Sequence, residues 1–319
     1  MSRAETLLVT GAAGFIGSTL VDALLAEGRE VVGLDSFDAF YAEGEKLRNL
    51  EQASKSSHFR LVRGDIRDAD LVRALLTETR FDCIVHLAAL AGVRPSLERP
   101  GVYADVNVIG TSTLLEAAVR SGVPRFVFAS SSSVYGERQS GPFLETDRVD
   151  HPISPYAATK KSAELVCHSF HSAHDLDVTC IRFFTAYGPR QRPDLAVRYF
   201  AERMLRGDSI PIYGDGSAVR DFTYVGDAVD GLVRAADTGL GYAVLNFGAG
   251  REISVLEMVG QLERTLGVKA EKDFRLPQVG DVSRTLADIT AARNALGYQP
   301  RVSFEQGVEL FAAWLGERR

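Results

Sequence analysis

Three glycines in the stretch TGAAGFIG constrain the fold more than any other feature of this sequence. Gly11, Gly14 and Gly17 stand between a β-rich run at residues 6–10 and an amphipathic stretch at about 15–26. Glycine permits a tight turn, the approach of a pyrophosphate and close packing of helix on strand, and a helix N-terminus offers unpaired N–H groups to an anion. The spacing alone could mark an ordinary tight turn. At the first strand–helix junction it predicts a dinucleotide-binding α/β fold.

Strand and helix signals alternate through the first half of the chain. Strand-like apolar runs lie at residues 6–10, 30–35, 59–65, 82–89, 125–131 and 177–184. Helical patterns separate them, notably at 101–121 and 154–174. Apolar strands joined by helical crossovers indicate a parallel sheet covered on both faces. We therefore expect a Rossmann-type, doubly wound parallel sheet of the α/β class.

The pattern changes after residue 184. Turn signals crowd into AYGPRQRPD and IYGDGSAVRD, and helical stretches at 255–266 and 304–315 have no regular strand partner. These features predict a smaller, irregular C-terminal lobe that is partly interleaved with the first. Residues 1–184 would form the nucleotide-binding domain, with later segments returning to it, and residues 185–319 most of the substrate-binding lobe.

Composition limits the class of protein. The 319 residues are 45% hydrophobic and 24% charged, and the formal net charge of −6 disfavours a broad nucleic-acid surface. No apolar run approaches the roughly 20 residues that cross a bilayer, and the glycine-interrupted N-terminus is unlike a cleavable signal. Cys83, Cys167 and Cys180 are odd in number and lack metal spacing, so we expect a reduced, cytoplasmic protein with no membrane or nucleic-acid partner.

Three histidines invite a metal interpretation. His168, His171 and His174 recur at every third position in CHSFHSAH. They lie toward the C-terminal end of the predicted helix at 154–174, where imidazoles commonly face solvent or the helix dipole. We therefore expect no metal site.

Two acids stand at the ends of predicted strands. Asp35 ends the second strand, about where a carboxylate should meet the ribose diol of a dinucleotide, and its charge repels a 2′-phosphate. NAD is therefore favoured over NADP. Asp65, in GDIRD, follows the third strand and could reach the adenine. The alternative role for Asp65 is a helix N-cap.

A tyrosine and a lysine share one face of a predicted helix. Tyr156 and Lys160, in SPYAATKKSAEL, are four residues apart. A tyrosine pKa of about 10 is too high for a useful base near neutral pH. A neighbouring ammonium and a positively charged nicotinamide ring would lower that pKa by favouring the phenolate. The pair alone is common by chance, but after a dinucleotide fingerprint it indicates a reacting centre.

Six motifs occur in an order that resembles a known family. They are TGAAGFIG, HLAA, SSSSVYG, SPYAATK, RFFTAYGPRQRPD and GDGSAVRDFTYV, and the likeness runs from Leu7 to about Trp314. Together they resemble the extended short-chain dehydrogenases/reductases. Among these they are most similar to the NAD-dependent nucleotide-sugar epimerases and dehydratases.

The resemblance implies a bound NAD and a UDP-sugar in the cleft between the lobes. Tyr156 would take a proton from a sugar hydroxyl, Lys160 would hold the cofactor ribose and tune Tyr156, and Ser131 would hydrogen-bond the same sugar oxygen. Asn107, in DVNVIGT, resembles the asparagine that steadies the active-site helix. The other cofactor contacts expected from the motifs are Phe15, Ile16, Ile66, Leu87, Ala88 and Ala89. Relatives pack the helices near 101–121 and 154–174 into a four-helix bundle, which implies a homodimer.

The row of serines departs from the dehydratase pattern. Dehydratases of the family carry an Asp–Glu pair directly after the catalytic Ser or Thr, whereas this chain has Ser132 and Ser133. Elimination of water then has no obvious acid, while C4 epimerisation needs none. Thr185 stands where galactose-type epimerases usually carry asparagine, and Arg190 and Arg192 follow it. These features resemble the UDP-glucuronate 4-epimerases.

A sugar carboxylate would suit such a neutral wall. Two buried carboxylates would repel it by several kcal/mol, whereas hydroxyls of Ser131, Ser132, Ser133 and Thr185 would each stabilise it by roughly 1.5–3 kcal/mol. Oxidation at C4 makes a β-keto acid, which loses CO₂ when the carboxylate bond stands perpendicular to the carbonyl plane. We hypothesise that the hydroxyls hold the carboxylate away from that orientation. The alternative is ordinary strand-end hydroxyls that bond the backbone.

Four arginines are candidates for the substrate. Arg220, in VRDFTYV, resembles the arginine that grips the UDP pyrophosphate, because a guanidinium fork suits phosphate. Arg284 could make a second phosphate contact, although the galactose-type enzymes carry theirs slightly earlier. Arg94, in AGVRPS, could approach the sugar or the phosphates, and Arg192 could contact the diphosphate or close over the sugar. A surface ion pair is the alternative role for Arg220.

Other functions remain open at this point. A neutral UDP-hexose 4-epimerase, acting on UDP-glucose or UDP-N-acetylglucosamine, and a UDP-sugar dehydratase with an acid elsewhere are the enzymatic alternatives. A non-catalytic NAD-sensing scaffold is disfavoured by the intact Tyr156, Lys160 and Ser131. A decarboxylase is disfavoured because that group usually has a glutamate in the serine row.

Overall fold

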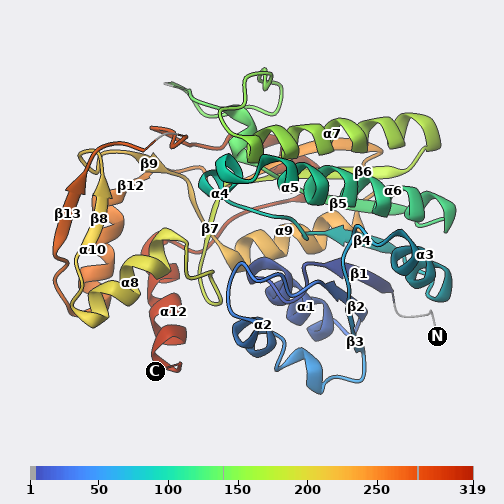
Figure 1. Ribbon diagram of the computed structural model, residues 1–319, viewed down its shortest axis with the longest axis horizontal. Coiled ribbons are helices and arrows are strands. Elements are labelled where there is room, and N and C mark those ends of the chain that lie inside the picture. The colour runs from blue at the N-terminus through green and yellow to red at the C-terminus, as the bar shows by residue number, and fades with distance from the viewer. Residues whose placement is uncertain (1–4, 139, 279, 319) are drawn as a thin grey trace.

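A computed structural model describes residues 5–138, 140–278 and 280–318. Within these residues a seven-stranded sheet forms in the order β11-β6-β5-β4-β1-β2-β3, and all neighbouring strands run parallel (Figure 1). Its strands are β1 (Thr6–Thr10), β2 (Glu30–Asp35), β3 (Phe59–Arg63), β4 (Cys83–His86), β5 (Arg125–Ser131), β6 (Asp177–Phe183) and β11 (Tyr242–Phe247). The predicted Rossmann-type parallel sheet is confirmed, and β11 is an edge strand that the sequence pattern did not reveal.

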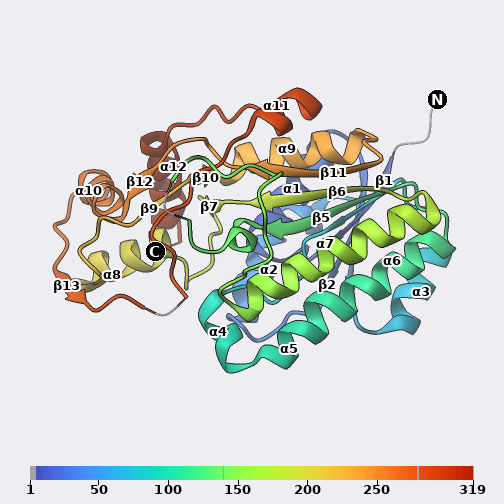
Figure 2. The ribbon, with the colours of Figure 1, turned by 90° about the horizontal axis from the view of Figure 1, so that it is seen from above.

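Helices cover both faces of the sheet (Figure 2). One face carries α1 (Phe15–Ala26), α9 (Val225–Asp237) and α11 (Thr290–Leu296). The other carries α3 (Ala69–Glu78), α6 (Gly110–Arg120) and α7 (Pro155–His174). Helix α7 begins after Ser154, whose hydroxyl accepts a hydrogen bond from the Ala157 N–H at 3.2 Å.

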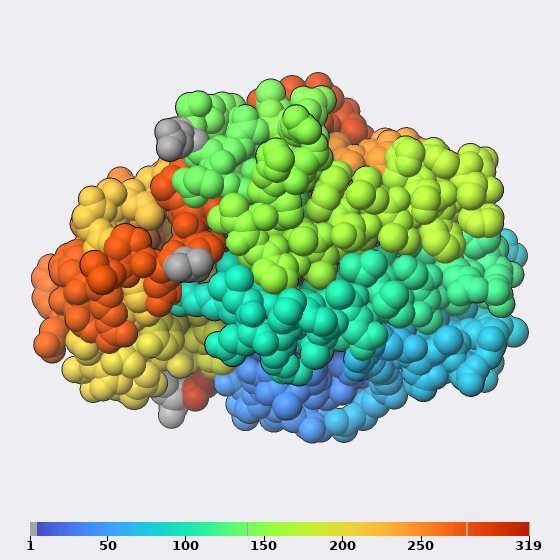
Figure 3. All heavy atoms as spheres, turned by 45° about the horizontal axis from the view of Figure 1, so that its top comes forward, coloured from blue at the N-terminus to red at the C-terminus, as the bar shows by residue number. Residues whose placement is uncertain are grey.

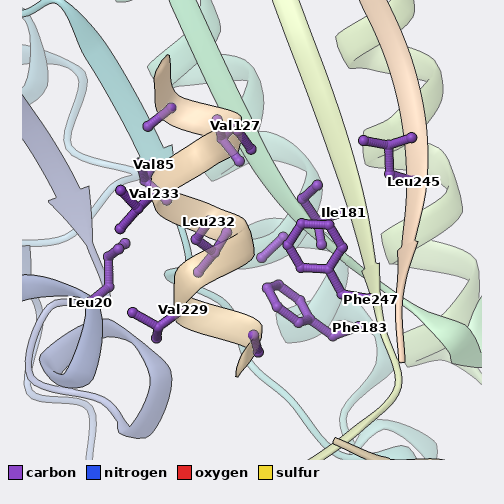
Figure 4. Packing of buried hydrophobic residues seen from close by; sticks show 14 of the residues in the cluster. Leu20, Val85, Val127, Ile181, Phe183, Val229, Leu232, Val233, Leu245 and Phe247 are labelled. Carbon is purple, nitrogen blue, oxygen red and sulfur yellow. The ribbon is translucent and has the colours of Figure 1, made fainter. Parts of the chain in front are cut away.

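The core on one face lies beneath α9 (Figure 4). Val229, Leu232 and Val233 of that helix pack toward Val85, Val127, Ile181, Phe183, Leu245 and Phe247 of the strands and toward Leu20 of α1. Each such side chain, fully buried, stabilises the fold by roughly 1.5–3 kcal/mol. Helix α9 comes from a late part of the chain, so this packing joins distant sequence to the first half of the sheet.

The stretch 101–121, expected as one helix, forms three consecutive segments. These are α5 (Pro100–Ala104), a π-helical turn η2 (Asp105–Ile109) and α6. The hydroxyls of Thr111, Ser112 and Thr113 donate to the carbonyl oxygens of residues 107–109 at 2.6, 2.9 and 3.1 Å. In the widened turn the Gly110 N–H donates to the Asp105 carbonyl oxygen, and the three hydroxyl bonds lie where this turn passes into α6.

The strand order reverses beside β1. Strands β2 and β3 lie on one side of it, and β4, β5, β6 and β11 on the other. At such a reversal, the loops that follow two neighbouring strands run in opposite directions and leave a crevice between them. Open α/β sheets bind their ligands in this crevice, at the carboxyl ends of the strands.

The remaining elements form a smaller group with its own apolar core. The helices α8 (Ala196–Arg206), α10 (Val255–Leu266) and α12 (Phe304–Gly316) pack together there. Short two-stranded sheets pair β7 (Thr185–Tyr187) with β10 (Phe222–Tyr224), β9 (Val219–Arg220) with β12 (Ile253–Ser254), and β8 (Ile210–Tyr213) with β13 (Lys272–Arg275). The chain crosses between the two groups, because α9, β11 and α11 return to the large sheet.

Shorter helices line the connections. They are α2 (Glu43–Asn49), the 3₁₀ turn η1 (Ala53–Lys55), α4 (Val93–Glu98) and the 3₁₀ turn η3 (Ser132–Tyr135). Within the described ranges no helix is both long and apolar enough to span a bilayer.

Candidate active site

A cavity of about 470 Å³ opens at the carboxyl ends of the strands. It brings together most of the residues singled out from the sequence, namely Gly11, Gly14, Phe15, Ile16, Gly17, Asp35, Asp65, Ile66, Leu87, Ala88, Ala89, Ser131, Ser132, Ser133, Tyr156, Lys160, Thr185 and Arg192. Asn107, Arg94, Arg220 and Arg284 are not among the described residues that line it. The candidate site is therefore one continuous space from the glycine-rich loop to the serine row.

The glycine-rich loop is shaped as a close-contact turn. Gly11 has φ of +69°, and a Cβ on Gly17 would lie 2.1 Å from the Gly11 carbonyl oxygen. Gly14 is the N-cap of α1, so the first N–H groups of that helix open onto the cavity wall. A turn bare of side chains in front of a helix N-terminus is the arrangement that admits a pyrophosphate.

Asp35 is a buried carboxylate held from two sides. Its Oδ2 accepts the Ala13 N–H at 2.9 Å and its Oδ1 accepts the Phe37 N–H at 2.8 Å. Each carboxylate oxygen can accept more than one hydrogen bond, so acceptor capacity remains on both oxygens. The carboxylate is thus fixed in orientation at the end of β2, beside the glycine-rich loop.

Asp65 is paired with an arginine. Its Oδ2 accepts Arg67 Nη2 at 2.7 Å and its Oδ1 accepts Arg67 Nε at 3.0 Å. The Arg67 guanidinium accordingly holds the pKa of the Asp65 carboxyl below its usual value. The N-cap alternative for Asp65 is wrong, because α3 is capped by Asp68, which accepts the Leu71 N–H at 3.0 Å.

Lys46 is a cavity residue that the sequence analysis missed. It lies on α2, is 6% exposed, and donates from Nζ to the Asp38 carbonyl oxygen at 2.7 Å. Its ammonium lies 4.9 Å from the centre of the Tyr41 ring, and Tyr41 lines the same cavity. The only hint in the sequence was a lysine on the helical stretch that follows Asp35. Helix α2 has seven residues, which is too short for its residue pattern to show which face is buried.

Tyr156 stands at the start of α7 and faces the cavity. Its ring meets that of Tyr103 edge-on, with centroids 6.3 Å apart. Burial raises the pKa of Tyr156 above its ordinary value, while a hydrogen bond with Ser131 and the charge of Arg192 act to lower it. The predicted acidification is therefore not met by the protein alone, because loss of solvent outweighs the favourable groups.

Lys160 is buried one turn further along α7. It is 4% exposed, and its Nζ donates to the Ala129 carbonyl oxygen on β5 at 2.7 Å. Burial lowers the pKa of Lys160 to about 8. The lysine thus joins the helix of Tyr156 to the strand of Ser131, and its remaining N–H groups are at the cavity wall.

One wall of the cavity is lined with hydroxyls. Ser131 Oγ donates to Ser133 Oγ at 3.1 Å and accepts the Ser133 N–H at 3.2 Å, which caps the η3 turn. Ser132 lies beside them, and Thr185 of β7 joins the same lining. The acids among the described lining residues are Asp35, Asp38 and Asp65, all from the β2 and β3 end. The serine wall therefore presents neutral donors, in line with the prediction.

Asn107 acts from behind the cavity wall. Its Oδ1 accepts the Leu90 N–H at 2.8 Å, and its Nδ2 donates to the Leu90 carbonyl oxygen at 2.9 Å and to Thr159 Oγ1 at 3.1 Å. It is 1% exposed. Its side chain thus ties the loop after β4 to the helix of Tyr156 and Lys160. Asn107 does not line the cavity, and its contact with the cofactor stays a prediction.

Comparison with known proteins identifies the family. Residues 8–311 match the family described as GDP-mannose 4,6 dehydratase. The chain belongs to this family. A UDP-glucuronate 4-epimerase of Thermodesulfobacterium geofontis is 40% identical over 97% of this chain and 96% of its own.

Solved structures of relatives have the same fold. A UDP-glucuronic acid 4-epimerase from Bacillus cereus, in complex with UDP-glucuronic acid and NAD, matches with a TM-score of 0.93 and 38% identity, over 98% of this chain and all of that one. A dTDP-glucose 4,6-dehydratase from Streptomyces venezuelae, with NAD bound, matches with a TM-score of 0.92 and 36% identity, over 98% of each chain. Because both chemistries share the fold, the residues of the cavity must distinguish between them.

Of the four arginines singled out from the sequence, Arg192 lines the cavity and the other three do not. Arg192 lines the cavity, forms an ion pair with Asp194 at 2.9 Å, and lies 4.9 Å from the centre of the Phe40 ring. Arg220 is partly buried, and its Nη1 donates to the Val219 carbonyl oxygen at 2.9 Å. Burial lowers the pKa of Arg220, while the charges of Asp281 and Glu137 act to raise it.

Arg94 and Arg284 already have carboxylate partners. Arg94 pairs with Asp281 at 2.9 Å and stacks 5.0 Å from the centre of the Tyr213 ring. Arg284 contacts Glu252 and donates to the Gly141 carbonyl oxygen at 2.9 Å. Both arginines are thus engaged at the outer rim, and their role as substrate contacts stays a prediction.

The rim of the site is closed by segments from distant parts of the sequence. Ser283 donates to Glu137, and Arg94 of α4 reaches Asp281. Figure 3 shows α4 in teal, the loop after β5 in green and the segment after β13 in orange-red side by side on one face. The late segment therefore spans the outer edge between the two groups of elements.

Proposed function

We propose that this protein is an NAD-dependent 4-epimerase that converts UDP-glucuronate to UDP-galacturonate. The observation that carries the proposal is the wall beside Tyr156, where Ser131, Ser132, Ser133 and Thr185 offer hydroxyls and no carboxylate. Relatives named as UDP-glucuronate 4-epimerases support it. A 4,6-dehydratase would need an acid at that wall, so the cavity favours simple epimerisation.

The cavity fits a dinucleotide. A Cβ on Gly11 would meet the backbone of Ala88 and one on Gly17 the backbone of Gly11, so only glycine permits the close packing of this turn against the start of α1. Asp35 is fixed with free acceptor capacity for two ribose hydroxyls. We propose Ile66, Leu87 and Ala88 as apolar contacts of the nucleotide, with Lys46 near its ribose. Bound NAD would supply the hydride acceptor and donor. The negative charge of Asp35 opposes a 2′-phosphate, which favours NAD over NADP.

The protein's own residues would manage one proton. Tyr156 would accept the proton of the sugar 4-hydroxyl and later return it, and Ser131 would hydrogen-bond the same oxygen. Burial holds Tyr156 protonated in the protein alone, so the charge of a bound positive ring and of Lys160 would be needed to favour the phenolate. Ser131, whose interaction with the phenol acts to lower the pKa of Tyr156, stands beside it for that exchange.

The hydroxyl wall would hold the carboxylate of the sugar. Ser132 and Ser133 after β5 and Thr185 of β7 line the same cavity, and each hydroxyl that donates to the carboxylate would stabilise it by roughly 1.5–3 kcal/mol. A carboxylate held near the carbonyl plane cannot release CO₂ readily. The neutral wall would therefore bind the acid sugar and also protect its oxidised form.

Arg220 would meet the diphosphate. It is a partly buried cation that donates to the Val219 carbonyl oxygen, and the charges of Asp281 and Glu137 act on it from a distance. A guanidinium in such surroundings suits a phosphate. Arg192 would approach from the cavity side. Arg94 and Arg284 would have to exchange their present partners to contribute.

The same proposal extends to organisation and setting. We propose that residues 1–184, with the returning segments, bind NAD and that most of 185–319 binds the UDP-sugar. Ile109 and Leu165 are 55% and 60% exposed on η2 and α7, which supports a homodimer through these helices. Cys83, Cys167 and Cys180 are free and buried, which supports a reducing, cytoplasmic setting.

The direct test is product analysis. Purified protein is given NAD with UDP-glucuronate, UDP-glucose or UDP-N-acetylglucosamine, and products are identified by mass spectrometry and NMR. We expect interconversion of UDP-glucuronate and UDP-galacturonate with no unsaturated product. Faster conversion of either neutral sugar, or an eliminated product, would refute the proposal.

Variants of the wall test the carboxylate role. Ser133→Ala and Thr185→Ala should weaken binding of UDP-glucuronate and release some UDP-pentose, because the carboxylate loses donors. Ser169→Ala, which removes a hydroxyl bonded within α7 at 2.7 Å, is the matched control. If neither wall variant changes binding or releases pentose, the wall does not hold the carboxylate.

A further inference from the structure

Ser130, the first serine of the row, faces away from the hydroxyl wall. Alternate residues of a strand face opposite sides of a sheet, and Phe126 and Phe128 of β5 belong to the core beneath α7. Ser130 continues that set, and its Oγ donates to Glu164 Oε1 of α7 at 2.5 Å. It is 3% exposed. All four serines border the cavity, but the Ser130 hydroxyl bonds Glu164 of the helix, whereas Ser131 and Ser133 bond each other.

Glu164 is the centre of a buried charged cluster. It lies one turn after Lys160 and two turns after Tyr156 on α7, and it is fully buried. Arg182 of β6 donates to it through Nε and Nη2, both at 2.9 Å, and Lys161 contacts its Oε2 at 3.2 Å. The carboxylate thus receives bonds from two neighbouring strands and from its own helix.

Arg182 connects this cluster to the turn that carries the wall. Its guanidinium lies 4.8 Å from the centre of the Tyr135 ring, and Tyr135 is the last residue of η3. The Tyr135 hydroxyl donates to Asn246 Oδ1 at 2.7 Å. The turn that contains Ser132 and Ser133 is therefore supported from below by the same arginine that holds Glu164.

A buried ion pair is weak evidence for stability, because loss of solvation offsets much of its attraction. Apolar residues of similar size would often pack as well. What such a pair supplies is a fixed geometry, because a guanidinium fork and a carboxylate meet in one relative orientation. Here that orientation fixes α7 against β5 and β6 directly behind the candidate site.

We propose that Ser130, Glu164 and Arg182 are positioning residues that set the separation of Tyr156 from the hydroxyl wall. Two consecutive contacts join the helix to the strand, Lys160 Nζ to the Ala129 carbonyl oxygen and Ser130 Oγ to Glu164. The first fixes the height of α7 and the second fixes its rotation. The inference rests on the proposed function for its kinetic consequences but not for its geometry.

Ser130→Ala is the most conservative test, because it removes one hydroxyl and leaves the ion pair intact. We expect kcat for UDP-glucuronate to fall about tenfold with KM changed less than twofold, and the share of UDP-pentose among the products to rise. Ser169→Ala, which removes a hydroxyl elsewhere on α7, should leave all three quantities at the wild-type level. Unchanged kcat and product ratio in Ser130→Ala would overturn the proposal.

A second readout does not depend on activity. Crystal structures of wild type and Ser130→Ala should show a longer separation of Ser131 Oγ from Tyr156 Oη in the variant, with the fold otherwise retained. An unchanged separation overturns the positioning role even if the wild type proves inactive on every UDP-sugar. If the wild type is inactive but the Ser131 Oγ to Tyr156 Oη separation lengthens in the variant as expected, the proposed function is refuted and the positioning role stands.

Arg182→Lys extends the test to the ion pair. Lysine keeps the charge but loses the fork, so we expect a lower kcat at unchanged cofactor affinity, measured by titration of NAD. Adding Ser130→Ala to it should lower kcat by much less than tenfold, because both changes release the same carboxylate. Full additivity of the two losses would show that they act separately and would overturn the shared role.

Discussion

The dinucleotide end and the hydroxyl wall of the cavity are built in different ways. At the dinucleotide end, contacts join residues close in sequence, such as Gly17 to Gly11 and Asp35 to Ala13. At the wall, Thr185 is held by a bond from its N–H to the Asp221 carbonyl oxygen, and Asp221 in turn accepts the N–H groups of Ala249, Gly250 and Ala287. The contacts named for the dinucleotide end join residues at most 22 apart, whereas those that hold Thr185 in place run through Asp221 to residues up to 66 further along the chain.

This difference separates what is common to the family from what is particular to this chain. A few neighbouring residues are enough to form the glycine-rich turn. The nucleotide end can therefore stay the same, and bind the same class of cofactor, in enzymes of different activity. The wall can be altered by single substitutions that leave the core under α7 and α9 unchanged. Relatives of nearly the same fold are named for an epimerase and for a dehydratase, and the difference must lie in such a wall.

The largest effect is expected where the two ends meet. Tyr156→Phe removes the hydroxyl that would exchange a proton while retaining the ring that packs on Tyr103. We expect kcat for UDP-glucuronate to fall by about 10³-fold or more, with NAD affinity and the thermal unfolding midpoint unchanged. Steady-state rates, NAD titration and a thermal melt measure these three. A loss of less than tenfold would assign the proton to another group.

Restoring the acid pair of a dehydratase should sharpen the contrast between the ends. In the double variant Ser132→Asp/Ser133→Glu, the wall gains negative charge while the dinucleotide end is untouched. We expect UDP-glucuronate to bind about a hundredfold more weakly, because its carboxylate meets like charges at low effective dielectric, and UDP-glucose to lose less than threefold. Isothermal titration with both sugars measures the difference. Equal losses for the two would place the sugar carboxylate elsewhere.

The sequence predicted most of the first lobe because its signals are local. Helix α7 begins after its Ser154 cap, and α10 begins with a Ser254–Glu257 capping box, each near the predicted boundary. Strand β11 was missed because residues 184–241, which mostly form the smaller group of elements, separate it from β6. No alternation of strand and helix signals therefore marks it in the sequence. The π turn at 105–109 was missed because one residue extra in a single turn leaves the helical periodicity of the whole stretch almost unchanged.

The candidate site was predictable where a strand end fixes a residue. Asp35, Tyr156 and the serine row reach the cavity because each stands at the edge of the sheet or the start of a helix. The contacts of the arginines were less predictable, because a long side chain can pair with residues that are near in space but distant in sequence. Arg94 and Arg284 have carboxylate partners at the rim that lie 187 and 32 residues away in sequence.

An intermediate effect is expected at the dinucleotide end alone. Asp35→Asn keeps the shape but leaves one oxygen to accept two N–H groups and the ribose, so NAD affinity should fall about tenfold and the preference over NADP should narrow. Binding of UDP, measured with NAD absent, should not change. Asp70→Asn on the exposed face of α3 is the control. A loss of UDP affinity in Asp35→Asn would show that the two ends are not independent.

The smallest effect is expected at the rim, where it decides between two roles for Arg94. Its side chain is half exposed and paired with Asp281, and exposed ion pairs contribute about 0–1 kcal/mol. If Arg94 only joins α4 to the late segment, Arg94→Ala should change KM for UDP-glucuronate less than threefold. Arg220→Met should raise it far more, because a cation facing the diphosphate is lost. A tenfold rise of KM for UDP-glucuronate in Arg94→Ala would mean that Arg94 exchanges Asp281 for the substrate. The segment that carries Asp281 would then take part in substrate binding.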